Sequence, residues 1–460
     1  MEALNVVVNV AFVLEKQSFI NLRLSAVPDS DPFTMPLFEG LSAGSEKSAV
    51  ILDIGAAYSK VGFAGEFGPW AFVSSKVKLS KTKKEVFVWD YSSEEELFDI
   101  LVEFFHLLYF KHLLVNPKDR RVVFCESILC PTQFRETVAK VLFKHYEVPS
   151  ILFAPSHLLA MFTLGINTGL VLDAGFSETT VLPIYEGIPI IKGVQTVTVA
   201  AREIHRNLAA LLQDQAVLIT DGEEAPLASK MSSLPDTVIE DIKVRTCFVT
   251  NINRARLIQQ SILQNDESKW PAVPSSVEYP LDGGSKLVVT GKVREVACEV
   301  LFEQDMEEKS VATTILDAIL QCPLDMRIPL AQNLVLMGGT SMLPGFAHRL
   351  VDELKELLSK PQYKDRLAIS SFKVHSPPSE ANYTAWLGGS LFGAMEILSY
   401  RSLSREAYNQ AGKVPDWCSL DDAVQEAEVV PKERSSMKQL EALRKLSLEK
   451  SSAGASPTPK

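Results

Sequence analysis

Short apolar runs that end in an Asp-x-Gly turn occur twice in this chain. Residues 49–55 (AVILDIG) form the first run, and a second apolar run opens eight residues after Asp53. Residues 169–175 (GLVLDAG) repeat the arrangement, again with an apolar run eight residues after Asp173. Apolar runs on both sides of a glycine-containing turn predict strand, turn and strand. Two such copies, 120 residues apart, predict two related α/β units.

A third apolar run, residues 333–337, leads into Gly338, Gly339 and Thr340. It shares the strand-and-turn pattern of the two hairpins but lacks their carboxylate. Paired glycines let a backbone approach a ligand closely. This loop is therefore suited to contact the base or sugar of a nucleotide.

Between the strands, apolar residues recur at helical spacing. The predicted helices cover residues 94–108, 134–146 and 311–320. Ser310 is placed to cap the third helix, and Pro323 follows where that helix should stop. Strands alternating with helices of this length predict an α/β architecture with a largely parallel core.

The composition narrows the possible partners. The 460 residues include 46 Lys and Arg against 57 Asp and Glu, a formal net charge of −11. This charge opposes attraction to a phosphate backbone, so nucleic acid is not expected as a partner. The six cysteines are scattered without a C-x-x-C pair, which is typical of a reducing cytosol. No apolar run approaches the ~20 residues of a spanning helix, so membrane insertion is not expected.

Both ends of the chain differ from its patterned middle. Residues 1–13 are largely apolar, but no basic region precedes them as in a secretory signal. We therefore expect an added or weakly ordered arm at this end. From Gly412 onward the sequence becomes charged and then rich in Ser, Ala and Pro, with one amphipathic helix plausible over 437–448. This tail is expected to be largely disordered.

The Asp-x-Gly turns carry the candidate chemistry. Backbone N–H groups of such a turn can hold phosphate oxygens, and its carboxylate can hold the water shell of Mg²⁺. Each copy alone is also compatible with an ordinary turn, since Asp and Gly favour turns. Two copies at matched spacing, with the glycine pair beside them, favour a nucleotide cleft.

Five motifs then occur in the order typical of one protein family. They are GFAGE, LPIYEG, DIK, GGTSMLPG and AWLGGS, which begin at residues 62, 182, 241, 338 and 385. On these motifs the chain resembles the actin-related proteins from about residue 49 to about residue 412. The resemblance implies the actin-like two-domain α/β fold of the actin, Hsp70 and sugar-kinase superfamily, with duplicated domains around a nucleotide cleft.

The resemblance also implies domain boundaries. They are an N-terminal extension over 1–34, a first actin-like domain over 35–168 with a shortened upper subdomain, a second over 169–375 with an inserted subdomain, C-terminal helices over 376–411 that return to the first domain, and a tail over 412–460.

Four further segments resemble the pointed-end actin-related proteins of dynactin. They are MPLFEG from Met35, LLVNPKDRRVV from Leu113, FEQD from Phe302 and VPDWCSL from Val414. The resemblance implies a structural subunit that caps the pointed end of dynactin's short filament and supports dynein-driven transport. The implied partners are actin, the major actin-related protein of dynactin, and dynactin subunits four, five and six. The implied location is cytoplasmic and cytoskeletal.

ATP or ADP with Mg²⁺, held as a structural ligand, is the cofactor that the resemblance implies. The implied nucleotide-binding residues are Asp53, Gly55, Lys60, Asp173, Gly175, Lys243, Gly338, Gly339 and Thr340. Lys243 resembles the family's base-contacting lysine, although Val244 stands where an acidic neighbour is expected. A solvated helix lysine is the alternative for Lys243. No metal site built from protein ligands alone is expected.

The phosphate turns depart from the family pattern. Ala56 and Ala57 stand where actin has Ser-Gly, so a hydroxyl donor is absent and a Cβ lies where the backbone should approach the ligand. Phe176 and Ser177 stand where the family has Asp-Gly, which removes a second carboxylate. These changes predict weaker support for the phosphates and the metal.

The residues that position the attacking water also differ. The family uses a Gln and a His, and the matching positions here are Ser156 and Thr180. Both side chains are shorter and offer different acceptor geometry, whereas hydrolysis needs a positioned group within hydrogen-bond reach of the water. We therefore expect no catalytic residue, and nucleotide hydrolysis that is lost or very slow.

The segment between Gly65 and Glu126 is shorter than the same region of actin, and this difference suggests the capping role. Sixty residues separate Gly65 from Glu126, markedly fewer than actin uses for its small upper subdomain and its gripping loop. A subunit without that loop would accept one neighbour and refuse the next, so that growth stops. A harmless deletion in a surface loop is the alternative interpretation.

Two other functions remain open from the sequence. A phosphotransferase of the same superfamily would require an acidic base beside a substrate pocket, and no residue is evident for that role. A chromatin-remodeller subunit would be expected to carry a nuclear-type basic cluster, for which residues 81–84 (KTKK) are short.

Overall fold

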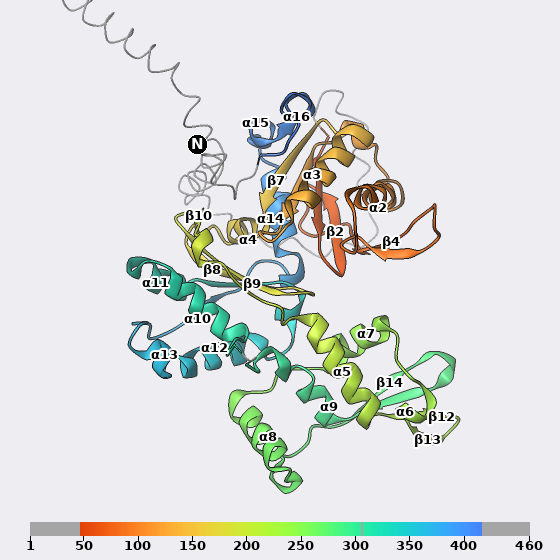
Figure 1. Cartoon of the computed structure of the whole chain (residues 1–460), viewed down its shortest axis with the longest axis vertical. Coiled ribbons are helices and arrows are strands. Elements are labelled where there is room, and N and C mark those ends of the chain that lie inside the picture. Colours follow the sequence, from red (N-terminus) through yellow and green to blue (C-terminus); the bar gives the residue numbers. More distant parts are fainter. Residues whose placement is uncertain (1–46, 305–306, 416–460) are drawn as a thin grey trace, which may run out of the picture.

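The computed structural model describes residues 47–304 and 307–415. Within them, two halves each form around a mixed six-stranded sheet, and a smaller lobe extends from the second half (Figure 1). No helix of the described residues is long and apolar enough to cross a membrane. The predicted extension over 1–34, and the predicted tail apart from 412–415, lie outside the described residues.

The first half, at the top of Figure 1, contains the first Asp-x-Gly hairpin. Its strands run in the order β18, β7, β6, β1, β2, β3. Their bounds are β1 (Val50–Ile54), β2 (Tyr58–Phe63), β3 (Ala71–Ser74), β6 (Val122–Glu126), β7 (Ser150–Pro155) and β18 (Leu403–Ser404). The pairs β1–β6 and β6–β7 are parallel, while β1–β2, β2–β3 and β7–β18 are antiparallel.

Helices α2 (Glu94–Leu107) and α3 (Thr132–Lys140) cover this sheet and continue as π-helical turns η1 (Leu108–Leu113) and η3 (Val141–His145). Ser93 caps α2 by accepting a hydrogen bond from the Glu96 N–H, which satisfies one of the donors left open at a helix start. Phe104 on α2 is fully buried. The helices predicted over 94–108 and 134–146 are confirmed.

The second half repeats the hairpin. Its strands run in the order β10, β9, β8, β16, β17, with β11 paired to β9. Their bounds are β8 (Gly169–Ala174), β9 (Thr179–Tyr185), β10 (Ile188–Pro189), β11 (Gln195–Val197), β16 (Leu334–Met337) and β17 (Val374–His375). Its helices are α10 (Val311–Gln321), α11 (Leu324–Ala331), α12 (Phe346–Leu357) and α13 (Pro361–Lys364). Ser310 caps α10 in a reciprocal capping box with Thr313, as the sequence predicts.

The smaller lobe, at the lower right of Figure 1, is inserted between β11 and α10. Its four-stranded antiparallel sheet runs in the order β13, β12, β15, β14. The strands are β12 (Val217–Thr220), β13 (Glu223–Pro226), β14 (Val277–Pro280) and β15 (Lys286–Val289), and the helices are α5 (Ala201–Gln215), α6 (Leu227–Lys230), α7 (Asp236–Thr246), α8 (Ile252–Gln264) and α9 (Gly291–Val296).

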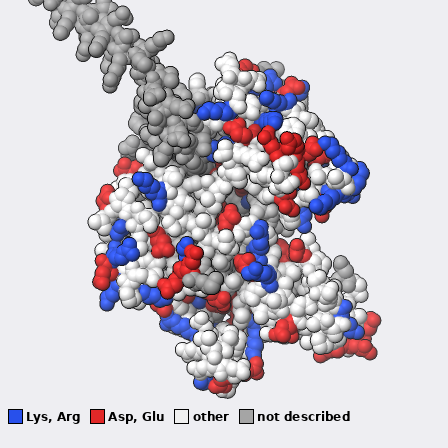
Figure 2. All heavy atoms as spheres, viewed as in Figure 1, with Lys and Arg blue, Asp and Glu red and all other residues white. Residues whose placement is uncertain are grey.

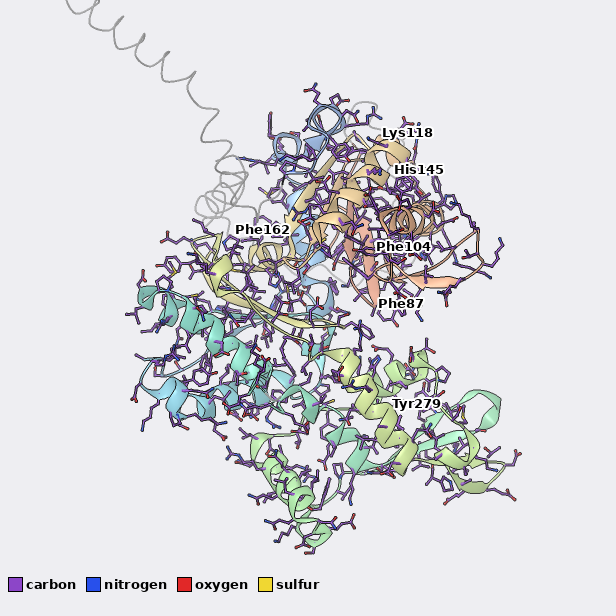
Figure 3. The ribbon with its side chains drawn as sticks, viewed as in Figure 1. Phe87, Phe104, Lys118, His145, Phe162 and Tyr279 are labelled. Atoms are coloured by element: carbon purple, nitrogen blue, oxygen red, sulfur yellow. The ribbon has the colours of Figure 1, made fainter. Side chains whose placement is uncertain are left out.

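The last helices return to the first half. They are α14 (Thr384–Gly393), α15 (Leu398–Arg401) and α16 (Arg405–Ala411). Helix α14 packs against α4 (Ser156–Leu164) so closely that a Cβ on Gly388 would lie 2.1 Å from the Leu159 carbonyl oxygen. Phe162 of α4, labelled in Figure 3, meets Phe392 of α14 edge to face with ring centroids 6.1 Å apart. This contact belongs to the hydrophobic cluster that packs α4 and α14 against β1 and β6 of the first half.

One fold prediction needs correction. The core was expected to be largely parallel, but the first sheet is parallel only across β1, β6 and β7, the second only across β8, β16 and β17, and the other pairs are antiparallel. The Asp-x-Gly hairpins themselves cause this, because a tight turn joins antiparallel strands. The duplicated hairpins are confirmed.

Candidate functional site

Three charged groups from the two hairpins converge where the halves meet. Lys60 Nζ lies 3.0 Å from Asp53 Oδ2 on the neighbouring strand. Burial raises the pKa of the Asp173 carboxyl to about 6, while the Lys60 ammonium opposes this shift and the Asp53 carboxylate adds to it. Because Asp53 and Lys60 act on Asp173 from the other hairpin, the two turns face one another. The sequence predicts this convergence.

The first turn is held from behind by side chains. A Cβ on Gly55 would lie 2.6 Å from the Tyr58 carbonyl oxygen, so the turn requires glycine. The Gly55 carbonyl accepts hydrogen bonds from Ser75 Oγ at 2.7 Å and Trp89 Nε1 at 3.2 Å. Contacts from later in the chain therefore fix the turn's shape without any ligand.

The residues that depart from the family in the second turn pack against α5. The Phe176 ring meets His205 edge to face with centroids 5.4 Å apart, and the Arg202 guanidinium lies 5.5 Å from its centre. Arg202 also donates to Ser177 Oγ at 2.7 Å. The carboxylate expected here is thus replaced by an aromatic and hydrogen-bonded contact with the smaller lobe.

The glycine pair lies directly beside the second hairpin. Strand β16 pairs in parallel with β8, and Met337 stands opposite Asp173. Gly338 follows with φ +90°, and a Cβ there would lie 2.2 Å from the Ala174 carbonyl oxygen and 2.6 Å from Asp173 Oδ1. No other residue type fits this approach, which brings the third loop to the carboxylate.

Thr340 and Gly339 differ in what they offer a ligand. Thr340 is buried, and its hydroxyl donates to the Gly175 carbonyl at 2.6 Å, so it ties the third loop to the second turn. Gly339 has open space, with Asn382 Cβ 3.9 Å from the position of an added Cβ as its nearest neighbour. Of the two, Gly339 presents the accessible backbone.

Lys243 lies in an ionic cluster between α5 and α7. Its Nζ lies 2.8 Å from Glu240 Oε2 and 3.0 Å from His205 Nε2, and His205 Nε2 lies 2.6 Å from the same carboxylate oxygen. Burial alone would raise the pKa of Glu240, but hydrogen bonds and charges from His205 and Lys243 lower it to about 2. Lys243 is buried and paired, unlike a solvated helix lysine. A contact between Lys243 and a base stays a prediction.

The two positions expected to have lost catalysis are both buried. Thr180 lies opposite Asp173 in the β8–β9 register, so the two side chains share one face of the sheet. Ser156 begins α4, and its Oγ lies 3.2 Å from His157 Nδ1. The loss of hydrolysis that we expect from these two residues stays a prediction.

His157 provides a pH-dependent test of this region. Burial lowers the pKa of His157 to about 4 from its usual 6.5. Above pH 6.5 the ring is neutral in both states; as pH falls below 6.5 the unfolded chain binds a proton first, so folding stability decreases. We expect His157→Gln to reduce the acid-induced loss between pH 7 and pH 4.5 by about 2 kcal/mol. Urea unfolding of both chains between pH 7 and pH 4.5 measures this difference. If the unfolding free energy of the variant falls with pH as steeply as that of the native chain, the prediction is wrong. His348→Gln, at an exposed histidine, is the control.

Sequence reasoning missed an aromatic bridge at the site. Phe72 on β3 pairs in register with Lys60, which pairs with Asp53, so the three side chains form one row across the sheet. The Phe72 ring meets Tyr383, the residue directly before α14, edge to face with centroids 6.1 Å apart. The apolar run over 71–73 could have suggested the strand, but not this partner.

The comparisons with known proteins agree with this geometry. A family model described as "Actin" matches residues 44–418. The chain belongs to the actin family. It is 28% identical over 440 residues to an actin-related protein 10 of Dictyostelium discoideum, covering 81% of this chain and 90% of that protein. It is also 26% identical over 397 residues to a putative actin-29 of the same organism, covering 79% and 95%. The predicted family and actin-like fold are confirmed.

Proposed function

We propose that this actin-related chain is a structural subunit that caps the pointed end of dynactin's short filament. It would bind a filament subunit, either actin or the major actin-related protein, on one edge. On the other it would bind dynactin subunits four, five and six, in the cytoplasm and in support of dynein-driven transport. The similarity to an actin-related protein 10 supports the assignment to this branch of the family.

The short hairpin that replaces the gripping loop carries the proposal. Strands β4 (Lys76–Lys78) and β5 (Glu85–Phe87) form the hairpin, and little chain remains before α2 begins at Glu94. The hairpin folds back on its own half, since Lys81 Nζ lies 2.5 Å from Asp99 of α2 and Lys76 lies over the Phe87 ring. Figure 2 shows its lysines as a blue cluster at the upper right. We propose that a hairpin this short does not hold a further actin subunit.

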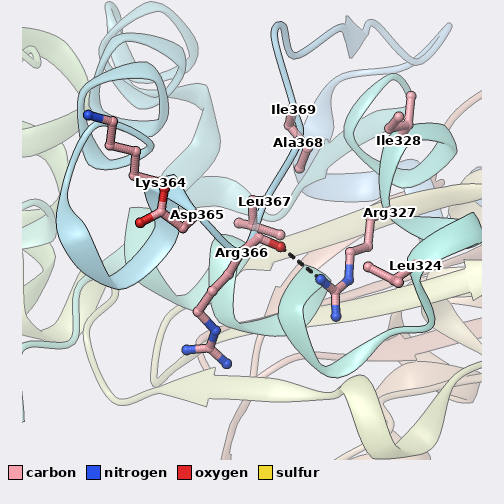
Figure 4. Close-up of a pocket in the computed structure, with 9 residues that line it drawn as sticks. All are labelled: Leu324, Arg327, Ile328, Lys364, Asp365, Arg366, Leu367, Ala368 and Ile369. Atoms are coloured by element: carbon pink, nitrogen blue, oxygen red, sulfur yellow. Dashed lines mark hydrogen bonds between the residues drawn. The ribbon is translucent and has the colours of Figure 1, made fainter.

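The edge of the molecule opposite the β4–β5 hairpin offers a surface that a filament subunit could bind. Leu324 and Ile328 of α11 are 77% and 54% exposed. They line a cavity of about 260 Å³ between α11 and the chain after α13, where Arg327 donates to the Arg366 carbonyl at 2.9 Å (Figure 4). Exposed apolar side chains grouped at a cavity are typical of an interaction site. In Figure 1, α11 lies on the far side of the molecule from the hairpin.

Bound nucleotide fits this role as a structural ligand. Asp53, Lys60 and Asp173 provide charge for Mg²⁺ and phosphate, and Gly338 and Gly339 allow close approach. A bound nucleotide would stabilise the closed form by mass action without turnover. The chemistry that ATP or ADP with Mg²⁺ supplies here is cohesion between the halves. We propose that the chain is not an ATPase.

Elongation of short filaments tests the proposal. The filaments consist of dynactin's major actin-related protein with blocked barbed ends, and fluorescent actin reports growth at the pointed ends. The native chain should stop growth at about one molecule per filament. Leu324→Asp with Ile328→Asp should raise the required concentration by at least about a hundredfold, because burial of each of the two apolar side chains contributes about 1.5–3 kcal/mol.

The control for this assay is Leu263→Asp. Leu263 on α8 is 79% exposed, which matches Leu324, but it lies in the smaller lobe. This variant should cap like the native chain. Incorporation of the native chain into growing filaments would contradict the capping proposal. If Leu263→Asp weakens capping as much as the α11 double variant does, the proposal that the α11 edge binds the filament is wrong.

A further inference from the structure

Strand β3 is the last strand of the first sheet, so one of its edges pairs with no described strand. The Ser75 N–H donates to the Ala57 carbonyl at 2.9 Å, which continues the β2–β3 ladder by one residue. Because hydrogen-bonded residues alternate along an antiparallel ladder, the N–H and C=O groups of Phe72 and Ser74 point away from β2. Both residues are exposed, and no described residue bonds these groups. The free edge of β3 therefore offers donors and acceptors to an added strand.

Two aromatic side chains stand along this edge. Trp70, directly before β3, and Phe72 are 62% and 48% exposed. The Trp70 nitrogen lies 2.8 Å from the position of a Cβ on Gly62, so Trp70 continues the line of β3 beside β2. The Trp70 ring packs edge to face on Phe63 with centroids 6.2 Å apart, and the Arg120 guanidinium lies 4.8 Å from the centre of the Phe63 ring. Trp70 is thus held in place with most of its surface open, which is typical of an interaction site.

The other end of β3 leads directly into the basic β4–β5 hairpin. Residues 70–87 contain five lysines and one glutamate, in a chain whose formal net charge is −11. Lys78 and Lys83 are exposed and form no ion pair with another described residue. The lysines of this hairpin form the blue cluster at the upper right of Figure 2. A partner that runs along β3 therefore meets positive charge at this end, which favours an acidic partner.

We propose that β3 binds an extended acidic segment of another protein, which adds to the first sheet as a further strand. The backbone of this segment pairs with Phe72 and Ser74, its apolar side chains pack on Trp70 and Phe72, and its carboxylates face the hairpin lysines. A membrane surface or a nucleic acid is also negatively charged, but neither has a peptide backbone to pair with the edge. This inference depends neither on filament capping nor on nucleotide binding.

A synthetic peptide tests the inference on the full chain. The probe is a short fluorescent peptide of alternating valine and glutamate, and fluorescence anisotropy measures its binding. We expect saturable binding that weakens about tenfold or more in the double variant Trp70→Ser with Phe72→Thr, because both aromatic contacts are lost. Tyr400→Ser removes an aromatic side chain that is 85% exposed on α15, and this control should bind the peptide like the native chain.

Two further changes separate the backbone and charge contributions. Ser74→Pro removes an N–H at the free edge without removing a bond to β2, and should weaken binding about tenfold. A peptide with lysine in place of glutamate should bind the native chain at least about tenfold more weakly. If the native chain does not bind the glutamate peptide, or if any of these changes leaves binding unaltered, the proposal is wrong. Dimers of the chain that the peptide dissociates would mean that a second copy occupies the edge, which would also contradict it.

Discussion

Asp173→Asn is expected to abolish binding of Mg²⁺-nucleotide and at the same time to stabilise the ligand-free chain. The carboxylate is positioned to serve a metal and phosphate, so its removal should weaken binding at least a hundredfold. Without ligand, ionised Asp173 is unfavourable, because burial raises the pKa of its carboxyl from 3.8 to about 6. The two effects therefore have opposite signs.

The size of the stability effect depends on pH. Below pH 3.8 the carboxyl is protonated in both the folded and unfolded states and has no effect. Above pH 6 it is ionised in both, and the full cost of its burial is present. Allowing for the water that reaches this partly exposed group, we expect Asp173→Asn to raise the unfolding free energy at pH 7.5 by about 2 kcal/mol.

Urea unfolding with and without Mg²⁺-ATP measures both effects. Asp53→Asn is the matched control, because the Asp53 carboxylate is already paired with Lys60 at 3.0 Å. That control should lose nucleotide affinity without gaining stability. A lower ligand-free stability for Asp173→Asn would show that the carboxylate is satisfied within the protein, and would remove the argument that it awaits a metal.

The hairpins could be predicted from the sequence because two local signals agree there. An apolar run specifies each strand, and Asp-x-Gly specifies each turn; the observed strands β1 and β8 match the predicted runs to within two residues. The start of α10 could be predicted for the same reason, because its cap depends on Ser310 and on residues close to it in the sequence. Where the hydrophobic pattern and the turn residues favour the same local structure, tertiary contacts do not need to change it.

The flanks of the sheets could not be predicted in this way. Strand β18 has two residues, and only its pairing with β7, some 250 positions earlier, makes it a strand. The three-residue strands of the β4–β5 hairpin also carry too little alternation for a pattern to be recognised. Such elements are defined by their partners, and a single sequence does not reveal partners.

The residues of the site also divide into those that could be predicted from the sequence and those that could not. Asp53 and Asp173 could be placed from sequence because each ends an apolar run at its turn, whereas Lys60 follows only from the resemblance to the family. The role of Phe176 could not, since the direction of its ring toward His205 depends on how α5 packs.

Arg135→Met is expected to destabilise the first half by about 3–5 kcal/mol, a loss that can abolish folding. Arg135 on α3 forms an ion pair with Glu126 at the end of β6, and the two side chains are 5% and 0% exposed. Removal of the guanidinium leaves the carboxylate buried without its ion-pair partner, and a buried charge in this state is far more costly than the loss of one contact.

The double variant Arg135→Met with Glu126→Leu separates this cause from simple loss of packing. Removal of both charges should recover at least half of the lost stability, because no buried charge remains without its counterion. Lys140→Met on the same helix breaks the exposed pair with Glu94 and should change stability by less than about 0.5 kcal/mol. Urea unfolding measures all three variants, or soluble yield where Arg135→Met does not fold. A double variant no more stable than Arg135→Met would mean that the pair acts through shape and hydrogen bonding, and that its charge adds nothing to the junction of β6 and α3.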